Sequence, residues 1–376
     1  MKIAVLRDRQ PHEKRVAASA ETIKKFIGLG AEVTVETGAG EGSRLADQVF
    51  TDAGATIAAD AASAVAGADV ILSVQRPDAA ALTGVKPGAV AVGLYAPYGE
   101  REALATLAKS GAALMAMEFV PRISRAQTMD ALSSQANLAG YKAVIDAAAV
   151  YGRAMPMMMT AAGTVAPARA LVFGAGVAGL QAIATARRLG AIVSATDVRP
   201  AAKEQVESLG ATFVAVIDDE FKQAETAAGY AKPMSAEYQA KQAALIAETI
   251  KKQDIAICTA LIPGRKAPVL ITEEMVMSMK PGSVIVDLAV EQGGNCPLSK
   301  PGEVVEVNGV TILGHLNVPS RLAQDSSSLY AKNLLNLVTL LIDKQSKQLN
   351  VPWDDEIVKG ALIARDGAIV HPQLQS

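Results

Sequence analysis

The sequence predicts an α/β protein built from two doubly wound parallel-sheet domains separated by a cleft. Short apolar segments, which suit buried strands, alternate along most of the chain with segments of helical periodicity. The chain has 376 residues, which is too many for one ordinary hydrophobic core. Because strands and helices follow a similar rhythm in both halves, we expect each half to contain one sheet.

The first half is expected to begin with a strand, a helix that ends at Gly30, and a second strand. A polar stretch at 121–130 then leads into a long helix, for which Ser124 or Thr128 is the candidate N-cap. The expected strands are 3–6, 31–36, 70–74, 89–94 and 113–119, and the expected helices are 20–29, 100–109 and 131–151.

The second half repeats this alternation with a more regular pattern. The expected strands are 170–173, 192–196, 212–217, 255–259, 283–288 and 310–313, and the expected helices are 176–189, 203–209, 239–251 and 272–279. Leucines and an isoleucine recur at helical spacing in 329–342, which we expect to pack back onto the first half. The expected domains are therefore 1–125 plus 329–376, and 126–328 including the connecting helix.

Composition excludes several classes of function. The net charge of −2 and the aromatic content of 4% argue against nucleic-acid binding. Cys258 and Cys296 lie in no metal-ligand or disulfide pattern, which favours a reducing compartment. The N-terminus has no signal-sequence pattern, and the uncharged runs 154–168 and 170–186 are too short and too interrupted to span a membrane. We therefore expect a soluble, cytoplasmic chain.

A glycine-rich turn lies between a strand and a helix of the second half. The strand 170–173 leads into Gly174, Ala175, Gly176, Val177, Ala178 and Gly179, which form a GxGxxG pattern. In a Rossmann-like fold the first glycine allows a tight turn, the second lets pyrophosphate approach the backbone, and the third allows close helix–strand packing. The alternative is a glycine-rich turn without a ligand. The ordered strand, turn, helix and next strand favour a dinucleotide site.

An acidic residue ends the next strand, about 20 residues beyond the glycines, where a ribose-binding acid is expected. This residue is Asp197, followed by Val198 and Arg199. A carboxylate favours NAD over NADP because it repels a 2′-phosphate, whereas Arg199 could accept that phosphate or be a surface charge. NAD(H) is the cofactor that we expect.

Two further segments are candidates for the nucleotide site. Thr259–Gly264, with Ala260 and Leu261, follows the fourth strand of this domain, although it could be a simple turn. The connection 221–239 is long and contains Gly229 beside Tyr230. We interpret it as a lid with a glycine hinge and an aromatic tip, with an ordinary flexible loop as the alternative.

The sequence offers no clear proton donor for a dehydrogenase. His12, His315 and His371 are its three histidines, and none lies in a recognisable acid/base motif. Hydride transfer between two nicotinamide rings needs no such group, only rings held at contact distance with water excluded. The polar stretch could meet that need, unless it is an ordinary exposed linker. Its candidate catalytic residues are Arg122, Gln127, Asp130 and Ser133, with an Arg–Asp pair that could hold the loop.

Several segments together resemble domain I of the proton-translocating NAD(P) transhydrogenases, a family related to alanine dehydrogenase. The similarity covers nearly the whole chain and is carried by 122–130, 133–141, 157–164, the GAGVAG turn, 195–199, Gly229-Tyr230, 259–264 and 287–298.

The resemblance implies a homodimeric NAD(H)-binding component, for which the Met-rich segment 155–159 is a candidate contact. This component would dock on a separate NADP(H)-binding domain, while a membrane domain conducts protons. It would therefore lie peripheral to the membrane through its partner subunits. The resemblance places the nicotinamide site at the candidate catalytic residues, the adenosine ribose at Asp197 and the loop tip at Tyr230.

Two alternatives remain open from the sequence. An alanine dehydrogenase would have a lysine where this chain has Gln75, a histidine near 95–98, and an aspartate where it has Glu291. Arg15 is what remains of that substrate-binding set. The other alternative is a non-catalytic NAD-sensing module, which would bind NADH without exchanging hydride in any complex.

Overall fold

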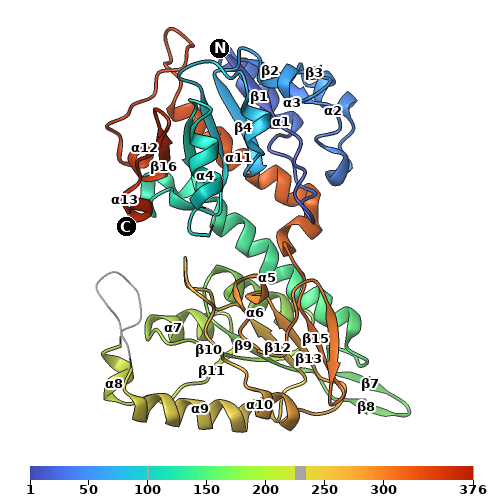
Figure 1. Ribbon diagram of the computed structural model, residues 1–376. Coiled ribbons are helices and arrows are strands. Elements are labelled where there is room, and N and C mark those ends of the chain that lie inside the picture. Colours follow the sequence, from blue (N-terminus) through green and yellow to red (C-terminus); the bar gives the residue numbers. More distant parts are fainter. Residues whose placement is uncertain (100, 225–233, 376) are drawn as a thin grey trace. The chain divides into compact units, whose positions relative to one another are not determined.

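The computed structural model describes residues 1–99, 101–224 and 234–375 and divides the chain into two compact units. Unit 1 comprises Met1–Gln135 and Pro319–Ser376, and unit 2 comprises Ala136–Val318. Each unit has a largely parallel sheet with helices on both faces (Figure 1). This architecture confirms the predicted α/β class with two Rossmann-like sheets.

Unit 1 contains an eight-stranded sheet in the order β3-β2-β1-β4-β5-β6-β16-β17. The first six strands in this order are parallel, whereas β16 and β17 add an antiparallel edge. The strands are β1 Lys2–Val5, β2 Glu32–Glu36, β3 Thr56–Ala58, β4 Val70–Gln75, β5 Val90–Leu94, β6 Ala113–Ala116, β16 Leu362–Arg365 and β17 Ala368–Ile369. Ala113–Ala116 ends before a 3-10 turn at Met117–Phe119, so the expected strand 113–119 was too long.

Alternate strand residues of unit 1 enter two separate cores, one on each face of the sheet. One core includes Ile3 and Val5 and packs against α1, α2, α11 and α12, whereas the other includes Ala4 and packs against α3, α4 and α13. These helices are α1 Ala20–Gly28, α2 Asp47–Asp52, α3 Ala61–Val65, α4 Arg101–Ala108, α11 Ala323–Leu340, α12 Glu356–Ala361 and α13 Pro372–Gln375. The helix α11 contains most of the segment that was expected to return to the first half.

Unit 2 contains a seven-stranded sheet in the order β11-β10-β9-β12-β13-β15-β14, with β14 antiparallel at one edge. The strands are β9 Arg169–Phe173, β10 Ile192–Thr196, β11 Thr212–Phe213, β12 Ile255–Cys258, β13 Val284–Asp287, β14 Val304–Val307 and β15 Val310–Leu313. The expected strand 212–217 is real only at its first two residues. Its continuation leaves the sheet and leads to the short helix α8 Asp219–Lys222.

Helices cover both faces of the second sheet as well. One core joins the strands to α5, α6 and α7, and the other joins them to α9 and α10. Their bounds are α5 Ala131–Val150, α6 Val177–Arg188, α7 Ala201–Ser208, α9 Ala236–Ile250 and α10 Glu273–Ser278. Within the described ranges, none of the helices is both long and apolar enough to cross a membrane.

The uncharged run 154–168 forms a small antiparallel hairpin. Its strands are β7 Met158–Thr160 and β8 Gly163–Val165, which pair with each other and form a separate two-stranded sheet. Met157 and Met159 are 60% and 79% exposed. Three consecutive exposed methionines at 157–159 are unusual on a surface, because methionine side chains are normally buried.

Candidate functional site

The strand order of unit 2 places two loops at one point of its sheet edge. Numbered along the chain, β11-β10-β9-β12-β13-β15 is the order 3-2-1-4-5-6, which reverses direction between β9 and β12. The loop Gly174–Gly179 follows β9, and Thr259–Gly264 follows β12. Ligands of open α/β sheets bind at such a reversal, outside the carboxyl ends of the strands.

The glycine turn has the backbone geometry that a bound pyrophosphate requires. Gly174 has a φ of +91°, which L side chains rarely adopt. A Cβ on Gly179 would lie 1.8 Å from the carbonyl oxygen of Gly174, so only glycine allows α6 to approach β9 this closely. By contrast, a Cβ on Gly176 would meet nothing within 4 Å. The backbone at Gly176 is therefore open to a ligand.

The N-terminus of α6 is available to an anion. Gly176 is the N-cap of this 12-residue helix, and no side chain accepts a hydrogen bond from its first turn. The exposed N–H groups and the helix dipole favour a negative charge at this end. Val177 is 41% exposed at the same place. The turn and the helix terminus thus fit the phosphates of a dinucleotide.

Asp197 lies at the end of β10, beside the glycine turn. Its carboxylate accepts hydrogen bonds from the Ala175 N–H at 2.7 Å and the Arg199 N–H at 2.9 Å, and from the Arg199 guanidinium at 2.9 and 3.0 Å. Burial raises the pKa of Asp197, but the hydrogen bonds and charge of Arg199 and the bond from Ala175 outweigh it and lower the pKa. Asp197 is therefore ionised, and Arg199 folds back onto it.

The second loop of the crevice is tied to the first by buried hydrogen bonds. The Thr259 hydroxyl contacts the carbonyl oxygens of Phe173 and Gly174 at 2.9 and 3.1 Å. The amide of Asn295, fully buried, accepts from the Ala260 N–H and donates to the Ala260 and Pro268 carbonyls. Leu261 next to Ala260 remains 46% exposed. Asn295 was not singled out from the sequence, because its partners lie about 30 residues away.

Unit 1 repeats part of this arrangement without the glycines. Glu36 ends β2, and its carboxylate accepts the Arg7 N–H at 2.8 Å and pairs with Arg9. These contacts match those of Asp197 with Ala175 and Arg199. The loop after β1 carries Arg7, Asp8 and Arg9 instead of glycines, so it offers no backbone cradle for pyrophosphate. We therefore assign the dinucleotide-binding features to unit 2.

The polar stretch of unit 1 forms a 3-10 helix, Ser124–Met129, followed directly by α5. Asp130, rather than Ser124 or Thr128, caps α5: its carboxylate accepts the Ser133 N–H at 2.8 Å and the Ser133 hydroxyl at 2.6 Å. Arg122 and Gln127 are exposed. Asp130 and Ser133 thus define the start of the helix, and Arg122 and Gln127 present their side chains to solvent in the isolated unit.

The Arg–Asp pair of this stretch differs from the expected one. Arg125 makes a two-bond contact with Asp355, with N–O distances of 2.7 and 3.0 Å, whereas the carboxylate of Asp130 accepts from Ser133. Asp355 is the N-cap of α12, more than two hundred residues away along the chain. The sequence could not reveal this pairing because it depends on the return of the C-terminal segment to unit 1.

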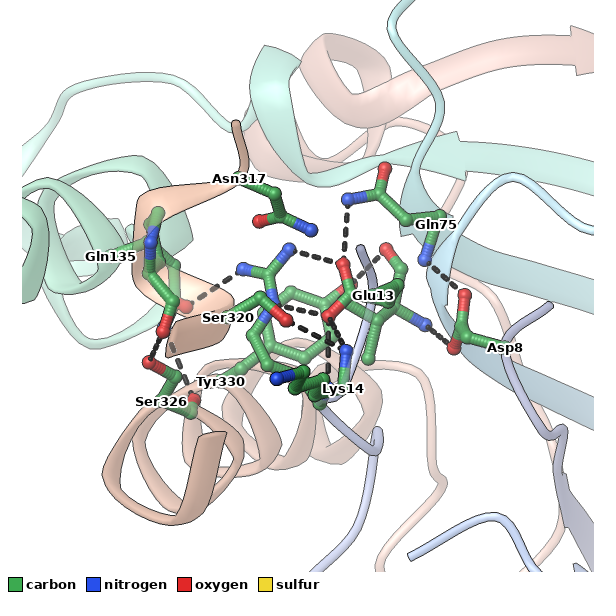
Figure 2. Close-up of polar contacts among 12 residues, drawn as sticks. Asp8, Glu13, Lys14, Gln75, Gln135, Asn317, Ser320, Ser326 and Tyr330 are labelled. Carbon is green, nitrogen blue, oxygen red and sulfur yellow. Dashed lines mark hydrogen bonds and ion pairs between the residues drawn. The ribbon is translucent and has the colours of Figure 1, made fainter. Parts of the chain in front are cut away.

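A buried ionic cluster lies at the corresponding edge of unit 1 (Figure 2). Arg15 donates to both oxygens of Glu13, at 2.8 and 2.6 Å, and to the side-chain oxygen of Gln135 at 2.8 Å. Gln75 donates to Glu13 at 2.9 Å. The side chains of Glu13 and Arg15 are 0% and 3% exposed. The guanidinium therefore has its donor edge engaged within the protein.

The histidines do not form an acid/base site. His371 is buried and its ring stacks on Phe119 with centroids 4.3 Å apart, and burial lowers its pKa. His12 and His315 lie in loops after β1 and β15. No group of three potential metal-ligating side chains occurs in the described ranges. Gly229 and Tyr230, the expected hinge and tip, lie outside the described residues, and Val198 is 57% exposed beside Asp197.

The reversal of strand order, the glycine turn and the open helix terminus define a Rossmann-type protein. Comparisons with known proteins agree. Models of the alanine dehydrogenase/PNT N-terminal and C-terminal domains match residues 4–139 and 143–372. The chain is 59% identical to an NAD(P) transhydrogenase subunit alpha polypeptide of Rhodospirillum rubrum, covering 100% of this chain and 99% of the relative. It is 31% identical to the alanine dehydrogenase of Halomonas elongata, covering 99% and 95%.

A solved structure of the transhydrogenase from Sinorhizobium meliloti aligns with a TM-score of 0.90 and 55% identity, covering 98% of this chain and 100% of that chain. The chain belongs to the alanine dehydrogenase/PNT family, within its group of NAD(P) transhydrogenase alpha subunits.

Proposed function

We propose that this chain is the NAD(H)-binding component of a proton-translocating transhydrogenase. In this proposal NAD(H) binds at the glycine turn of unit 2, with its pyrophosphate at Gly176 and the N-terminus of α6. The open space at Gly176 is the observation that carries the proposal, because a glycine with nothing against it is costly to keep for packing alone. The similarity to transhydrogenase alpha subunits gives the reaction.

The residues of the adenosine side would act on the ribose. The ribose hydroxyls would take up one of the positions that the guanidinium of Arg199 occupies on Asp197. The carboxylate already accepts four hydrogen bonds, about as many as its lone pairs allow, so a ribose must replace a donor rather than add to them. Arg199 would then be released next to the adenosine.

Hydride transfer would require positioning and no proton donor. A hydride, one proton with two electrons, leaves C4 of NADH and reaches C4 of NADP⁺, which gives NAD⁺ and NADPH without any change in oxygen or nitrogen protonation. Gln127 would hold the nicotinamide carboxamide and Arg122 would respond to the ring's charge. Asp130 and Ser133 would fix the loop that carries them, as their mutual hydrogen bonds support.

The partners follow from the same family. NADP(H) would be held by a separate partner domain, and a membrane domain would couple the exchange to proton translocation, so that this chain lies peripheral to the membrane in the cytoplasm. We further propose a homodimer that buries the exposed methionines 157–159 of the β7–β8 hairpin. Met159→Lys should shift the chain toward monomer in analytical ultracentrifugation, and an unchanged dimer would contradict this interface.

Alanine oxidation is the competing reaction, because alanine dehydrogenases are relatives of this chain. An amino-acid substrate needs a cation for its carboxylate and an acid/base for its amine. Arg15 is the candidate cation, but Glu13 and Gln135 engage its guanidinium. Gln75 carries no charge, and its amide contacts Glu13. These contacts favour transhydrogenation.

Reconstitution with a separately purified NADP(H)-binding domain tests the proposal. We expect NADH-dependent reduction of NADP⁺, or of a nucleotide analogue with a distinct absorbance, only when both proteins are present. NADH binding without exchange would instead indicate a sensing module. Oxidation of alanine with NAD⁺ by the chain alone would show the dehydrogenase reaction and overturn the proposal.

A further inference from the structure

A chain of buried hydrogen bonds runs through unit 1 to the segment that carries Gln127. Arg15 donates to the Gln135 side-chain oxygen at 2.8 Å, and the Gln135 amide donates to the Ser134 hydroxyl at 3.2 Å. The Ser134 hydroxyl donates to the Asn333 side-chain oxygen at 2.8 Å. Finally, the Asn333 amide donates to the Thr128 carbonyl at 2.9 Å. We call these five residues the Arg15–Thr128 relay.

Every bond of the relay donates in the same direction, from the cation toward the carbonyl. Bonds aligned in this way polarise one another, and burial increases the effect because the surrounding dielectric is low. Arg15, Gln135 and Asn333 are 4%, 6% and 7% exposed. At the Arg15 end, Glu13 holds the guanidinium through two further bonds, and Figure 2 shows Glu13, Gln75 and Gln135 gathered there.

Asn333 is the member that joins separate parts of the chain. It lies on α11, and its one amide contacts both Thr128 in the 3-10 helix and Ser134 in the first turn of α5. Thr128 directly follows Gln127. Between its two contacts lies Asp130, whose bonds to Ser133 end the segment. The amide of Asn333 therefore spans the segment from which Gln127 projects.

We infer that Asn333 is a positioning residue for hydride transfer: it fixes the backbone at Thr128, and through it the direction in which Gln127 presents its carboxamide. This inference rests on the proposed role of Gln127 at the nicotinamide. Asn336 also donates to the Thr128 carbonyl, at 3.2 Å, but it is more exposed and has no bond to Ser134 among the described contacts. Asn333 is the residue that links the two sides of the segment.

Asn333→Asp is the sharpest variant because it keeps the size and the acceptor for Ser134 but places an oxygen against the Thr128 carbonyl. With the NADP(H)-binding domain present, we expect hydride transfer to slow by about tenfold to a hundredfold, as small misplacements of reacting groups do. NADH affinity should change less than threefold. Thr339→Ala is the matched control on α11, since the Thr339 hydroxyl bonds only within its own helix in the described contacts. It should transfer at the wild-type rate.

A double-mutant cycle with Gln127→Asn separates positioning from mere stability. If Asn333 acts through Gln127, Asn333→Asp should slow transfer little further in the Gln127→Asn background. Independent, multiplicative losses would overturn the inference. Wild-type transfer rates in Asn333→Asp, with only a lower melting temperature, would overturn it as well.

Hydrogen exchange of the amides 124–130 gives a readout that does not depend on activity. Exchange without nucleotide should be faster in Asn333→Asp than in wild type and unchanged in Thr339→Ala, and equal protection in all three would contradict the inference. Ser134→Ala breaks the relay from its other side and should reproduce the effect if the Asn333 variant does not fold. A wild-type chain that transfers no hydride would remove the proposed function and this inference together, whereas normal transfer in the variants removes only the inference.

Discussion

Asp130 and Ser133 form a closed pair at the start of α5, in which one carboxylate oxygen accepts the Ser133 N–H at 2.8 Å and the other accepts its hydroxyl at 2.6 Å. This pair caps the helix that connects the polar segment of unit 1 to the rest of the chain. The residues that are proposed to serve the nicotinamide therefore include the ones that define the local backbone.

Loss of the cap should be measurable as stability. Asp130→Ala is expected to lower the free energy of unfolding by about 1 kcal/mol, the usual cost of removing an N-cap side chain. Asp130→Asn, which can still accept the Ser133 N–H, should cost less. Urea denaturation followed by circular dichroism gives both values, and equal stability of Asp130→Ala and wild type would show that the cap contributes nothing.

Gly176 and Gly179 should respond differently to alanine. Gly176→Ala has room in the fold but places a methyl group where pyrophosphate would approach, so NADH affinity should fall at least about tenfold at an unchanged melting temperature. Gly179→Ala should destabilise the protein, because its Cβ would lie 1.8 Å from the Gly174 carbonyl. Gly152→Ala, which also has open space, is the control. NADH binding by Gly176→Ala as tight as wild type would contradict the proposed site.

Asp197 should set the choice between the two nucleotides. Asp197→Asn removes the charge that repels a 2′-phosphate while Arg199 stays nearby, so NADH should bind more weakly and NADPH relatively better. Equilibrium titration of both nucleotides measures the ratio of their affinities. Arg199→Ala in the same titration tests whether the guanidinium competes with the ribose, in which case NADH binds more tightly. Wild-type protein that prefers NADPH would contradict the role of Asp197.

Two buried carboxyls of unit 1 should make stability depend on pH. Burial is the main cause that raises the pKa of Asp8 and of Glu118 to about 7 each, against backbone hydrogen bonds that lower both. Because the folded state holds these protons more tightly than the unfolded state, their contribution is complete below about pH 4 and is lost as the pH rises to about 7 and above. Unfolding free energy should therefore decline over this window.

The double variant Asp8→Asn, Glu118→Gln removes both titrations and should show a flatter pH dependence between about pH 4 and 8. Its absolute stability is expected to be lower at acidic pH, because Asp8 accepts the N–H groups of Val74 and Gln75 and an amide can accept only one of them well. Parallel profiles for wild type and variant would contradict the raised pKa values.

The fold class could be predicted because its signals are local. A fully buried parallel strand appears as an apolar run, and the order of strand, glycine turn and helix at β9 and α6 is contiguous in the chain. Strand β11 was predicted too long because the apolar run 214–217 continues beyond the point where the backbone leaves the sheet. Periodicity cannot show where a hydrogen-bonded partner ends.

The sequence by itself determined the two sheets, the glycine turn and the acid at the end of β10, because each depends on neighbours in the chain. Tertiary structure alone decided which polar groups meet. Arg199 folds onto Asp197, Arg125 pairs with Asp355, and Asn333 joins Thr128 to Ser134. A side-chain amide or guanidinium has the same composition wherever it lies, and its partners exist only once α11 and α12 have packed against unit 1. Pairings over some two hundred residues follow from the fold and cannot be read from spacing.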